Sequence, residues 1–495
     1  MSELSRRTML KGIAAGLTVA GWSASRGSWV PAAAGQSTDL EMLPPLDGTV
    51  ETGPAVLASF GADFGHLVTG TPTAVLRPGS VQDIVKMVRY ARRHGLSVAM
   101  NGQSGAGGEL ESHSNYGQAL APGGIAIDAR GLSTIHAIGA TSADVDAGVT
   151  WAELTDAAAA VGRTPPMLTD FLGLSVGGTL SVGGVGGTMQ HVGAQVDNVI
   201  ELQVVTGEGE LVTCTPTRHA GLFTAVLAGA GQCAIIVRAK VALAPAATHV
   251  LVVNLFYEDL DAYLADQLRL LDDGRFDYQE GQIVRRPDDS GWRYMLEAAS
   301  YYTPPQAPDQ AALLAGLSDD RSAAVIMNPT YSEWVHRVDP AVEALKAAGL
   351  WAQPHPWVSL FVPASRAFQL VGSVVAQLAP SDLGAGLATL FPVRTAKLRR
   401  PLLVVPRSEP AAFHLSLLRF PFPGSSSTGL LTQNRAFHDQ AVTLGGKRYI
   451  IGAVPDMTSR DWRRHYGALW PVFRAAKERY DPDGILTPGQ HIFSP

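Results

Sequence analysis

Three glycine-rich stretches in the first half of the chain have the composition of a ligand-binding surface. They cover residues 102–124, 173–188 and 228–234. Because glycine lacks a Cβ atom, consecutive backbone N–H groups can turn toward one anion, and the main chain can lie against a flat ring. One such stretch alone is more typical of a tight turn. Together they predict a dinucleotide site, and the first surrounds a single imidazole, His113.

The third stretch, "GAGQCA", fits a variant of the nicotinamide-dinucleotide fingerprint through Gly229, Gly231 and Ala234. That fingerprint requires a helix directly after the glycine loop, because the helix N-terminus binds the pyrophosphate. Here the loop is followed by "IIVRAKVAL", which alternates like a strand. A Rossmann domain is therefore the weaker interpretation.

The first glycine loop lies between two predicted strands. A helix beginning after Ser80 and ending at Gly95 precedes it, with Ser80 as the predicted capping residue. Residues 97–100 predict a strand that enters the loop, and residues 123–130 a strand that leaves it. The loop should therefore lie at the end of a sheet.

Later segments complete a mixed pattern of helices and strands. Thr150 and Glu153 predict a capping box at the start of a helix that ends at Gly162. Residues 198–215 predict a hairpin, and from about residue 248 longer helices with proline-rich connections begin. The predicted class is α+β, with a second domain in the later part.

Composition excludes several classes of function. The 495 residues are 46% hydrophobic, which suits two or three globular domains, and the net charge of −6 lacks the basic excess that nucleic-acid binding needs. Two cysteines, Cys214 and Cys233, cannot form a disulfide framework, and the 13 histidines show no metal-binding spacing. We expect neither a nucleic-acid partner nor a metal.

The N-terminus resembles an export signal. Paired Arg6 and Arg7 in "SRRTMLKG" precede a short apolar run and three small residues at 32–34. The pair favours a twin-arginine signal over residues 1–34, and a general secretory signal is the alternative. The apolar run is far shorter than the ~20 residues of a membrane-spanning helix. We therefore expect an exported protein, periplasmic or secreted, without stable membrane insertion.

Seven stretches resemble one known family in the same order from about residue 54 to 493, covering nearly the whole mature chain. They are "FGHLVTGTPTAVLRPGSVQDI", "GQALAPGGIAID", "TDFLGLSVGGTLSVGG", "VIELQVVTGEGELVTC", "LFTAVLAGAGQ", "PHPWVSLFVP" and "YDPDGILTPGQHIF". These stretches are similar to the cytokinin dehydrogenases, which are FAD enzymes of the vanillyl-alcohol-oxidase type. The resemblance implies a PCMH-type FAD-binding domain over residues 35–247, a substrate-binding cap domain over 248–448, and a C-terminal segment, 449–495, that returns to the FAD domain.

The resemblance also implies roles for the first glycine loop. In the family this loop cradles the FAD pyrophosphate, and its histidine is joined covalently to the flavin. His113, Ser114 and Gln118 match the end of that motif, and its entering side is matched by Asn101, Gly102 and Gln103. Residues 104–111 are additional to the family's loop, so FAD held noncovalently is the alternative.

Two carboxylates match substrate-site positions of the family. Asp170 in "LTDFLG" matches the aspartate that accepts the proton of the substrate amine, and Glu297 in "YMLEAAS" matches a carboxylate that binds a purine N–H. Turn capping for Asp170 and an ordinary strand-edge charge for Glu297 are the alternatives. Further FAD contacts implied by the resemblance, besides Asp170 itself, are Thr169, Ser175, Ser181, Val185, Ile236, Tyr449, Thr487 and Gln490.

The predicted function is FAD-dependent oxidation of a secondary amine, with an N6-isoprenoid adenine as the family's substrate and oxygen or a quinone as electron acceptor. One departure concerns a tryptophan that forms a wall of the substrate pocket in plant members, where this chain has Leu398. A different amine is therefore an open possibility. An alcohol or sugar oxidase of the same superfamily and a purine- or flavin-binding protein without turnover are the alternatives.

Overall fold

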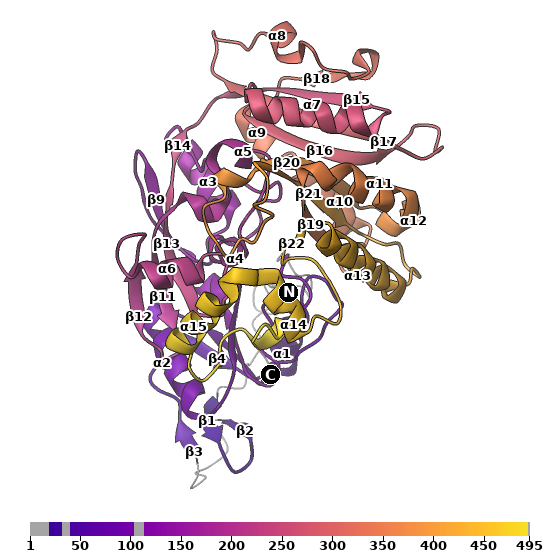
Figure 1. Ribbon diagram of the computed structural model, residues 1–495. Helices are drawn as coiled ribbons and strands as arrows, with labels where there is room; N and C mark the ends of the chain where they lie inside the picture. Colours follow the sequence, from indigo (N-terminus) through magenta and orange to yellow (C-terminus); the bar gives the residue numbers. More distant parts are fainter. Residues whose placement is uncertain (1–18, 32–39, 103–112, 494–495) are drawn as a thin grey trace, which may run out of the picture.

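The computed structural model describes residues 19–31, 40–102 and 113–493 (Figure 1). Two groups of sheets, one formed before about residue 247 and one after it, face each other, and helices cover their outer sides. The mixture of parallel and antiparallel sheets with helices confirms the predicted α+β class. Within the described residues no helix has the length and apolar character needed to cross a membrane.

A four-stranded sheet carries the first glycine loop. Its strands, in spatial order, are β4 (Thr49–Glu51), β5 (Ala74–Arg77), β7 (Ile125–Asp128) and β6 (Val98–Asn101). β6 and β7 are parallel neighbours, so the loop between them starts at the carboxyl end of a buried strand, as predicted. The predicted helix is α2 (Val81–Arg93), whose apolar face packs on this sheet.

The predicted cap of α2 is wrong in its chemistry. Ser80 occupies the N-cap position, but its hydroxyl donates to Asp47 Oδ2 at 2.7 Å instead of accepting from the helix. Asp83 of α2 accepts the backbone N–H groups of Asp47, Gly48 and Gly79. The Asp83 carboxylate therefore holds the backbone that precedes α2, and the Ser80 hydroxyl does not cap the helix.

A five-stranded sheet lies beside the first one. Its strands, in spatial order, are β12 (Leu211–Cys214), β11 (Val199–Thr206), β13 (Ala234–Ala242), β9 (Ser142–Asp146) and β8 (Ile135–Ile138). The predicted hairpin of β11 and β12 and the capping box of α3 (Trp151–Ala159) are confirmed. β13 follows the third glycine stretch directly, which confirms that no Rossmann helix begins there. The helices of this region are α1 (Pro54–Phe60), α4 (Val176–Val182), α5 (Met189–Val192) and α6 (Ala220–Val226).

Part of the predicted export signal is folded in the structure. The strands β1 (Val19–Ser23), β2 (Ser28–Pro31) and β3 (Leu40–Met42) form a small antiparallel sheet. Trp22 of β1 is buried near α2, and its backbone N–H donates to the hydroxyl of Tyr90 at 2.8 Å. Residues 1–18, with the arginine pair, and 32–39 lie outside the described residues, so the signal stays a prediction.

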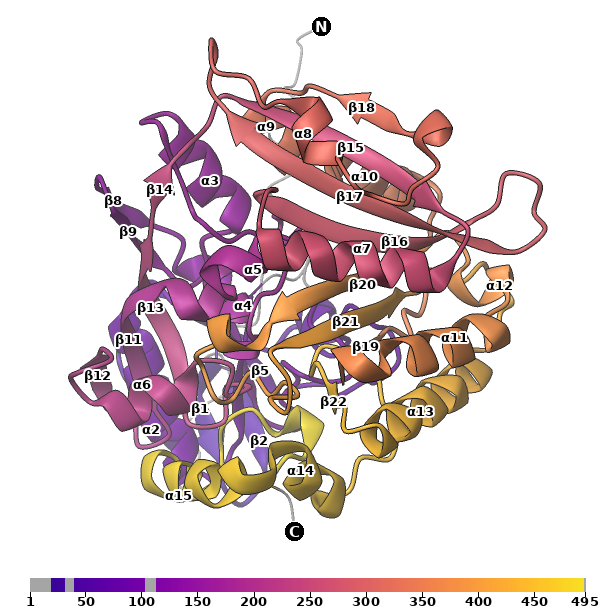
Figure 2. The same cartoon turned by 45° about the horizontal axis from the view of Figure 1, so that its top comes forward.

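The later part of the chain forms an eight-stranded antiparallel sheet. Its strands, in spatial order, are β18 (Val325–Met327), β15 (His249–Tyr257), β17 (Trp292–Tyr302), β16 (Tyr278–Arg285), β20 (Leu387–Arg394), β21 (Ala411–Leu418), β19 (Val358–Pro363) and β22 (Lys447–Arg448). Figure 2 shows α7 (Leu260–Asp273), α11 (Ala367–Gln377) and α13 (Ser427–Thr443) along one face of this sheet. The second core lies between these helices and the sheet.

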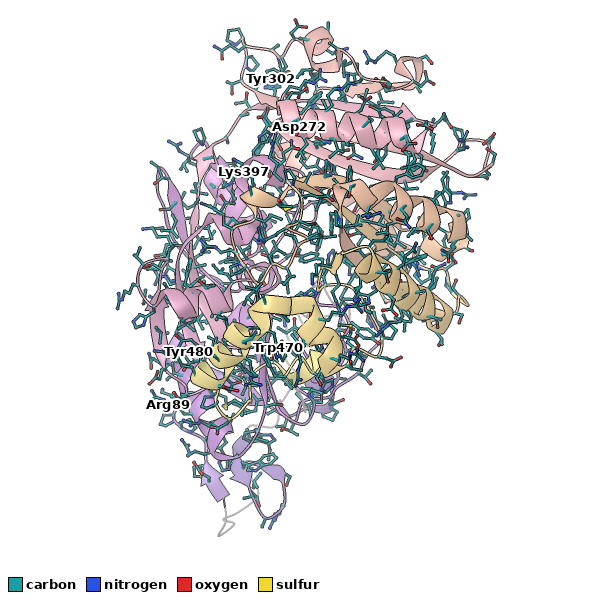
Figure 3. The ribbon with its side chains drawn as sticks, in the orientation of Figure 1. Arg89, Asp272, Tyr302, Lys397, Trp470 and Tyr480 are labelled. Atoms are coloured by element: carbon teal, nitrogen blue, oxygen red, sulfur yellow. The ribbon has the colours of Figure 1, made fainter. Side chains whose placement is uncertain are left out.

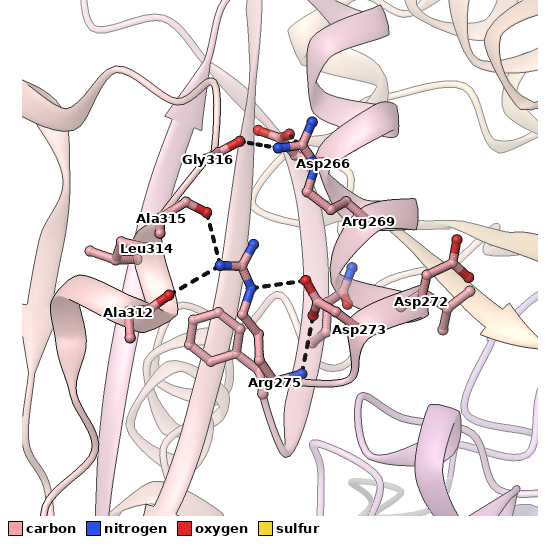
Figure 4. Close-up of polar contacts among 12 residues, drawn as sticks. Asp266, Arg269, Asp272, Asp273, Arg275, Ala312, Leu314, Ala315 and Gly316 are labelled. Carbon is pink, nitrogen blue, oxygen red and sulfur yellow. Dashed lines mark hydrogen bonds and ion pairs between the residues drawn. The ribbon is translucent and has the colours of Figure 1, made fainter.

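Arginines fasten the outer segment of this sheet to the end of α7 (Figure 4). Arg275 donates to the carbonyl oxygens of Ala312 and Ala315 at 3.2 and 2.9 Å, and Arg269 donates to that of Gly316. These contacts hold α8 (Gln310–Leu314) against the C-terminal end of α7. The remaining short helices are α9 (Tyr331–Val335), α10 (Asp339–Ala347) and α12 (Pro380–Leu383).

The C-terminal segment lies against the N-terminal half. α14 (Ser459–Tyr466) and α15 (Trp470–Tyr480) cross below the eight-stranded sheet in this view, and Figure 3 shows Trp470 and Tyr480 on the side of Arg89. Val98 of β6 exchanges backbone hydrogen bonds with Ile485 and Thr487 at 2.8 Å each. The domain boundaries predicted from the sequence stay predictions, because they are not tested by these contacts alone.

Candidate active site

A cavity of about 1000 Å³ lies between the N-terminal half and the eight-stranded sheet. One side, here called the glycine-rich wall, is formed by residue 102 and by the cavity-lining residues of the segments 113–119, 175–186, 230–236 and 487–490. The opposite side, here called the sheet wall, consists of Glu280, Gln282, Glu297, Thr389, His414 and Ser416. The cavity is at the upper end of the range for small-molecule sites, which suits a ligand as large as a dinucleotide.

Nearly all predicted site residues meet at this cavity. Those that line it are Gly102, His113, Ser114, Gln118, Thr169, Asp170, Ser175, Ser181, Val185, Ile236, Glu297, Tyr449, Thr487 and Gln490. Asn101 is buried at the end of β6 and does not line it, and Gln103 lies outside the described residues. Residues more than 380 positions apart in sequence thus surround one space.

Hydrogen bonds fix the shape of the glycine-rich wall. Tyr449 accepts the backbone N–H of Gly184 at 3.0 Å, and Thr487 donates its hydroxyl to the carbonyl of Gly231 at 3.0 Å. Gln118 donates to the carbonyl of Ile450 at 2.8 Å. The C-terminal segment therefore joins the glycine stretches into one surface.

Asp63 anchors the described end of the first glycine loop. Its carboxylate accepts the backbone N–H of Gly117 and lies within the turn formed by Gly65 to Leu67. Burial raises the pKa of Asp63 to about 6, although these backbone hydrogen bonds act in the opposite direction. The loop is thus held by a carboxyl group whose charge changes in the physiological range.

His113 lies in an aromatic part of the cavity. Its ring stacks on Phe171 with centroids 4.5 Å apart, and Phe64 and Trp357 lie at 4.6 and 5.0 Å. Nε2 is buried and has no hydrogen-bond partner among the described residues. Burial, with a smaller effect of His355, lowers the pKa of His113 to about 3, so the imidazole is neutral and keeps a nucleophilic lone pair.

Asp170 is the centre of a cluster of ionisable groups. It lies in the loop between β10 (Arg163–Thr164) and α4, at the edge of the glycine-rich wall. Arg337 Nη2 donates to Asp170 Oδ1 at 2.6 Å and to the hydroxyl oxygen of Tyr278 at 2.7 Å. Tyr278 donates to Glu280 Oε2 at 2.6 Å, and Arg337 Nε donates to Glu297 Oε1 at 3.3 Å. This cluster connects the two walls.

The carboxyl groups of this cluster differ in their tendency to ionise. Burial opposes ionisation of Asp170, but the charge of Arg337 and hydrogen bonds from Glu280 and Arg337 hold its pKa below its ordinary value. Burial and the Asp170 charge raise the pKa of Glu280 well above its ordinary value, and burial also raises that of Glu297. Asp170 is therefore the ionised carboxylate of the cluster, and Glu280 keeps its proton.

Sequence reasoning did not identify Glu280, Tyr278 or Arg337. Glu280 of β16 pairs directly with Glu297 of β17, so two carboxyl groups lie at opposite positions of the sheet. The alternation of Tyr278, Glu280 and Gln282 was the available signal, because in a strand it places three polar side chains on one face. Arg337 carried no such signal, since only the folded chain brings it to Asp170.

Further polar groups of the sheet wall lie on β20 and β21. Ser416 donates its hydroxyl to Ser359 Oγ at 2.8 Å, so its oxygen accepts Nε2–H of His414 at 3.2 Å. Burial lowers the pKa of His414 to about 3, and its Nδ1 has no partner among the described residues. His414 is therefore a neutral ring whose Nδ1 lone pair can accept one hydrogen bond.

Leu398 does not form a wall of the cavity, contrary to the expectation for this position. It is fully buried in the core between the two halves, directly after a turn at residues 395–397. Arg407 donates to its carbonyl oxygen at 2.5 Å. The exchange of tryptophan for leucine at this position thus falls in the core and makes no contact with the cavity.

Within the described part of the chain, no group of three or more His, Cys, Asp or Glu side chains is arranged to hold a metal ion. Cys214 and Cys233 are both buried free thiols.

Comparisons with known proteins agree with this geometry. A family model described as "FAD binding domain" matches residues 72–215, and one described as "Cytokinin dehydrogenase 1, FAD and cytokinin binding" matches residues 285–493. The chain is 38% identical over 448 residues to an uncharacterised oxidoreductase of the fasciation locus of Rhodococcoides fascians, covering 90% of this chain and 99% of that protein. It is 35% identical to cytokinin dehydrogenase 10 of Oryza sativa subsp. japonica, covering 87% of this chain and 86% of that protein. It is 32% identical to cytokinin dehydrogenase 1 of Arabidopsis thaliana, covering 87% and 80%.

Proposed function

Because the chain belongs to the cytokinin dehydrogenase family of FAD-dependent oxidoreductases, we propose that it oxidises the secondary amine of an N6-isoprenoid adenine. The products are adenine and an unsaturated aldehyde. The observation that carries this proposal is the ionised carboxylate of Asp170, which faces a dinucleotide-sized cavity and is held by Arg337 at 2.6 Å.

The cavity suits FAD on its glycine-rich wall. Backbone groups of the three glycine stretches line it, with Ser175 and Thr487 as additional hydroxyl groups. When bound, FAD accepts a hydride from the substrate carbon next to the amine nitrogen. The neutral ring of His113 in the same cavity supports a covalent bond between FAD and this residue.

Asp170 removes the proton in this mechanism. Its carboxylate accepts the amine N–H as the adjacent carbon loses hydride, and a low pKa keeps it ionised before the substrate arrives. Glu280, which retains its proton, stabilises the Asp170 charge by a hydrogen bond. The substrate leaves the oxidation as an imine, which water converts to the aldehyde and the primary amine.

The sheet wall supplies the recognition of the base. Glu297 offers a carboxyl oxygen to a purine N–H, and His414 offers a lone pair. The description of the family model that matches residues 285–493 includes cytokinin binding, which supports this part of the proposal.

Anaerobic mixing with isopentenyladenine tests the proposed function. We expect bleaching of the flavin absorbance near about 450 nm, a general flavin property. Bleaching by alcohols or sugars instead would assign an oxidase of another substrate class, and no bleaching by any of them would leave a binding protein. Reoxidation of the reduced protein by oxygen or by a quinone then identifies the electron acceptor.

Acid precipitation tests the covalent bond to His113. We expect the yellow colour in the pellet of the parent protein and in the supernatant of His113→Ala. Colour in the supernatant of the parent would establish noncovalent FAD.

Export through a twin-arginine signal is part of the same proposal. The arginine pair at residues 6 and 7 supports it. Cleavage after residues 32–34 would remove β1 and β2, which pack near α2. N-terminal sequencing of the exported protein therefore tests both the route and the fate of these strands.

A further inference from the structure

Arg337 is placed where it can control the base. Its guanidinium donates to Asp170 and Tyr278 through Nη2, to Glu297 through Nε and to the carbonyl of Trp334 through Nη1. It also lies over the ring of Trp334, 4.0 Å from the centroid. Contacts on three sides therefore fix the guanidinium in one position between the two walls.

The charges around Asp170 depend on this single cation. Among the described residues, Arg337 is the cation that forms an ion pair with Asp170, and it also pairs with Glu297. The other ionisable groups that face Asp170 are Tyr278 and Glu280 of β16. Glu333 of α9 also lines the cavity, but its carboxylate is exposed and caps the helix by accepting the N–H and hydroxyl of Thr330 at 2.8 Å each. Without the guanidinium, the carboxyl groups would repel one another and take up protons.

We infer that Arg337 is a positioning residue for the proposed reaction: it holds Asp170 ionised and oriented as the base, and it keeps Glu297 as a carboxyl partner when Asp170 takes up the substrate proton. The second contact matters because an arginine left without a counterion in a partly buried site is costly. Glu297 thus acts on Arg337 in addition to any contact with the substrate. This inference rests on the proposed amine oxidation.

The pH dependence of flavin reduction by isopentenyladenine separates this role from simple packing. In Arg337→Gln, we expect the acid limb of kcat/KM to move upward by about 1–3 pH units, the usual effect of a neighbouring arginine on an aspartate. At pH values below the acid limb of the parent, kcat/KM of Arg337→Gln should thus be about 10- to 1000-fold lower than that of the parent. This difference should shrink as the pH rises. Arg337→Lys should move the limb less, because it keeps the charge and loses the forked geometry.

Two further variants make the result decisive. Glu297→Gln removes an anion that competes with Asp170 for Arg337, so the acid limb of kcat/KM in this variant should stay in place or move to lower pH. Arg275→Gln is the matched control, because the Arg275 side chain is 19% exposed against 20% for Arg337 and also donates to carbonyl groups, but on the outer face of the sheet. Its limb should equal that of the parent. A loss in Arg337→Gln that is equal at all pH values, an unchanged limb, or an upward shift in Glu297→Gln would overturn the inference.

A measurement without turnover keeps the inference testable if the amine is not a substrate. The carboxyl signal of Asp170 can be followed by ¹³C NMR in holoprotein labelled at aspartate and assigned by its loss in Asp170→Asn. We expect it to titrate at higher pH in Arg337→Gln, and in Arg337→Lys if the first variant does not fold. Equal titration in the parent and both variants would overturn the inference, whereas failure of parent reduction alone would overturn only the proposed function.

Discussion

The two walls of the cavity are built by opposite means. The glycine-rich wall uses backbone groups from short, contiguous stretches, and few of its side chains are ionisable. The sheet wall uses side chains from β16, β17, β20 and β21, which antiparallel pairing brings together from residues more than 130 positions apart. In the proposed function, one wall holds a large planar ligand, and the other tunes charge and selects the substrate. Asp170 and Arg337 join them.

The largest expected effect is at the contact between the walls. Asp170→Asn keeps the size of the side chain but cannot accept a proton, so flavin reduction by isopentenyladenine should slow by about 10²- to 10⁴-fold. FAD content should stay equal to that of the parent, because the amide still fits the loop. Stopped-flow absorbance measures both, and Asp288→Asn, in an exposed turn, is the control. Reduction at the parent's rate would remove Asp170 as the base.

This difference between the walls also explains what the sequence could predict. His113, Gln118 and Ser175 were identified from contiguous motifs, and all three line one cavity, while their contacts with FAD stay predictions. Glu280 and Arg337 meet Asp170 only through strand register and the position of α9, and neither follows from local spacing. Sequence reasoning therefore predicted the fold class and one wall, and it missed most of the other.

The same physical reason accounts for the wrong expectation at Leu398. The motif match gave its position along the chain, but the turn at residues 395–397 directs this residue into the core. The Ser80 cap failed in a similar way, because Asp47, 33 positions earlier, takes the serine hydroxyl. Long-range partners decided both outcomes.

A second prediction concerns the anchor of the glycine-rich wall. The folded state raises the pKa of Asp63 from an ordinary value of 3.8 to about 6, so it binds a proton that the unfolded chain has released. The stability from Asp63 is thus fully present below about pH 4 and is lost as the pH rises through 6, by about 3 kcal/mol. Denaturant unfolding of the parent and Asp63→Asn at pH 4.5 and 7.5 should show a difference between the two proteins that changes with pH. A constant difference would contradict it.

A third prediction tests the close backbone approach within the glycine-rich wall. A Cβ atom at Gly489 would overlap the carbonyl oxygen of Gly117. Gly489→Ala should therefore push the C-terminal segment away from the first glycine loop and lower the free energy of unfolding by about 1–3 kcal/mol. FAD should also dissociate more readily where it is not covalently bound. Gly53→Ala, where a Cβ meets open space, is the control and should match the parent.

The smallest expected effect is on the sheet wall, where the imidazole of His414 should contribute more to substrate binding than to the stability of the fold. His414 is buried with Nδ1 lacking a partner among the described residues, a state that costs about 1–3 kcal/mol without a ligand. His414→Leu should therefore leave the free energy of unfolding unchanged or raise it by about 1 kcal/mol. Loss of one hydrogen bond to the substrate should raise KM by about 2- to 10-fold.

The matched control for this last comparison is His465→Leu. His465 is also a buried neutral imidazole with a nitrogen that lacks a partner among the described residues, but it lies beside a different, smaller cavity lined by Arg435 and Lys447. Its replacement should change stability in the same direction and leave KM equal to that of the parent. If His414→Leu strongly lowered the free energy of unfolding while KM stayed constant, the imidazole would contribute to the packing of the sheet and not to substrate binding. The assignment of substrate recognition to the sheet wall would then be wrong at this position.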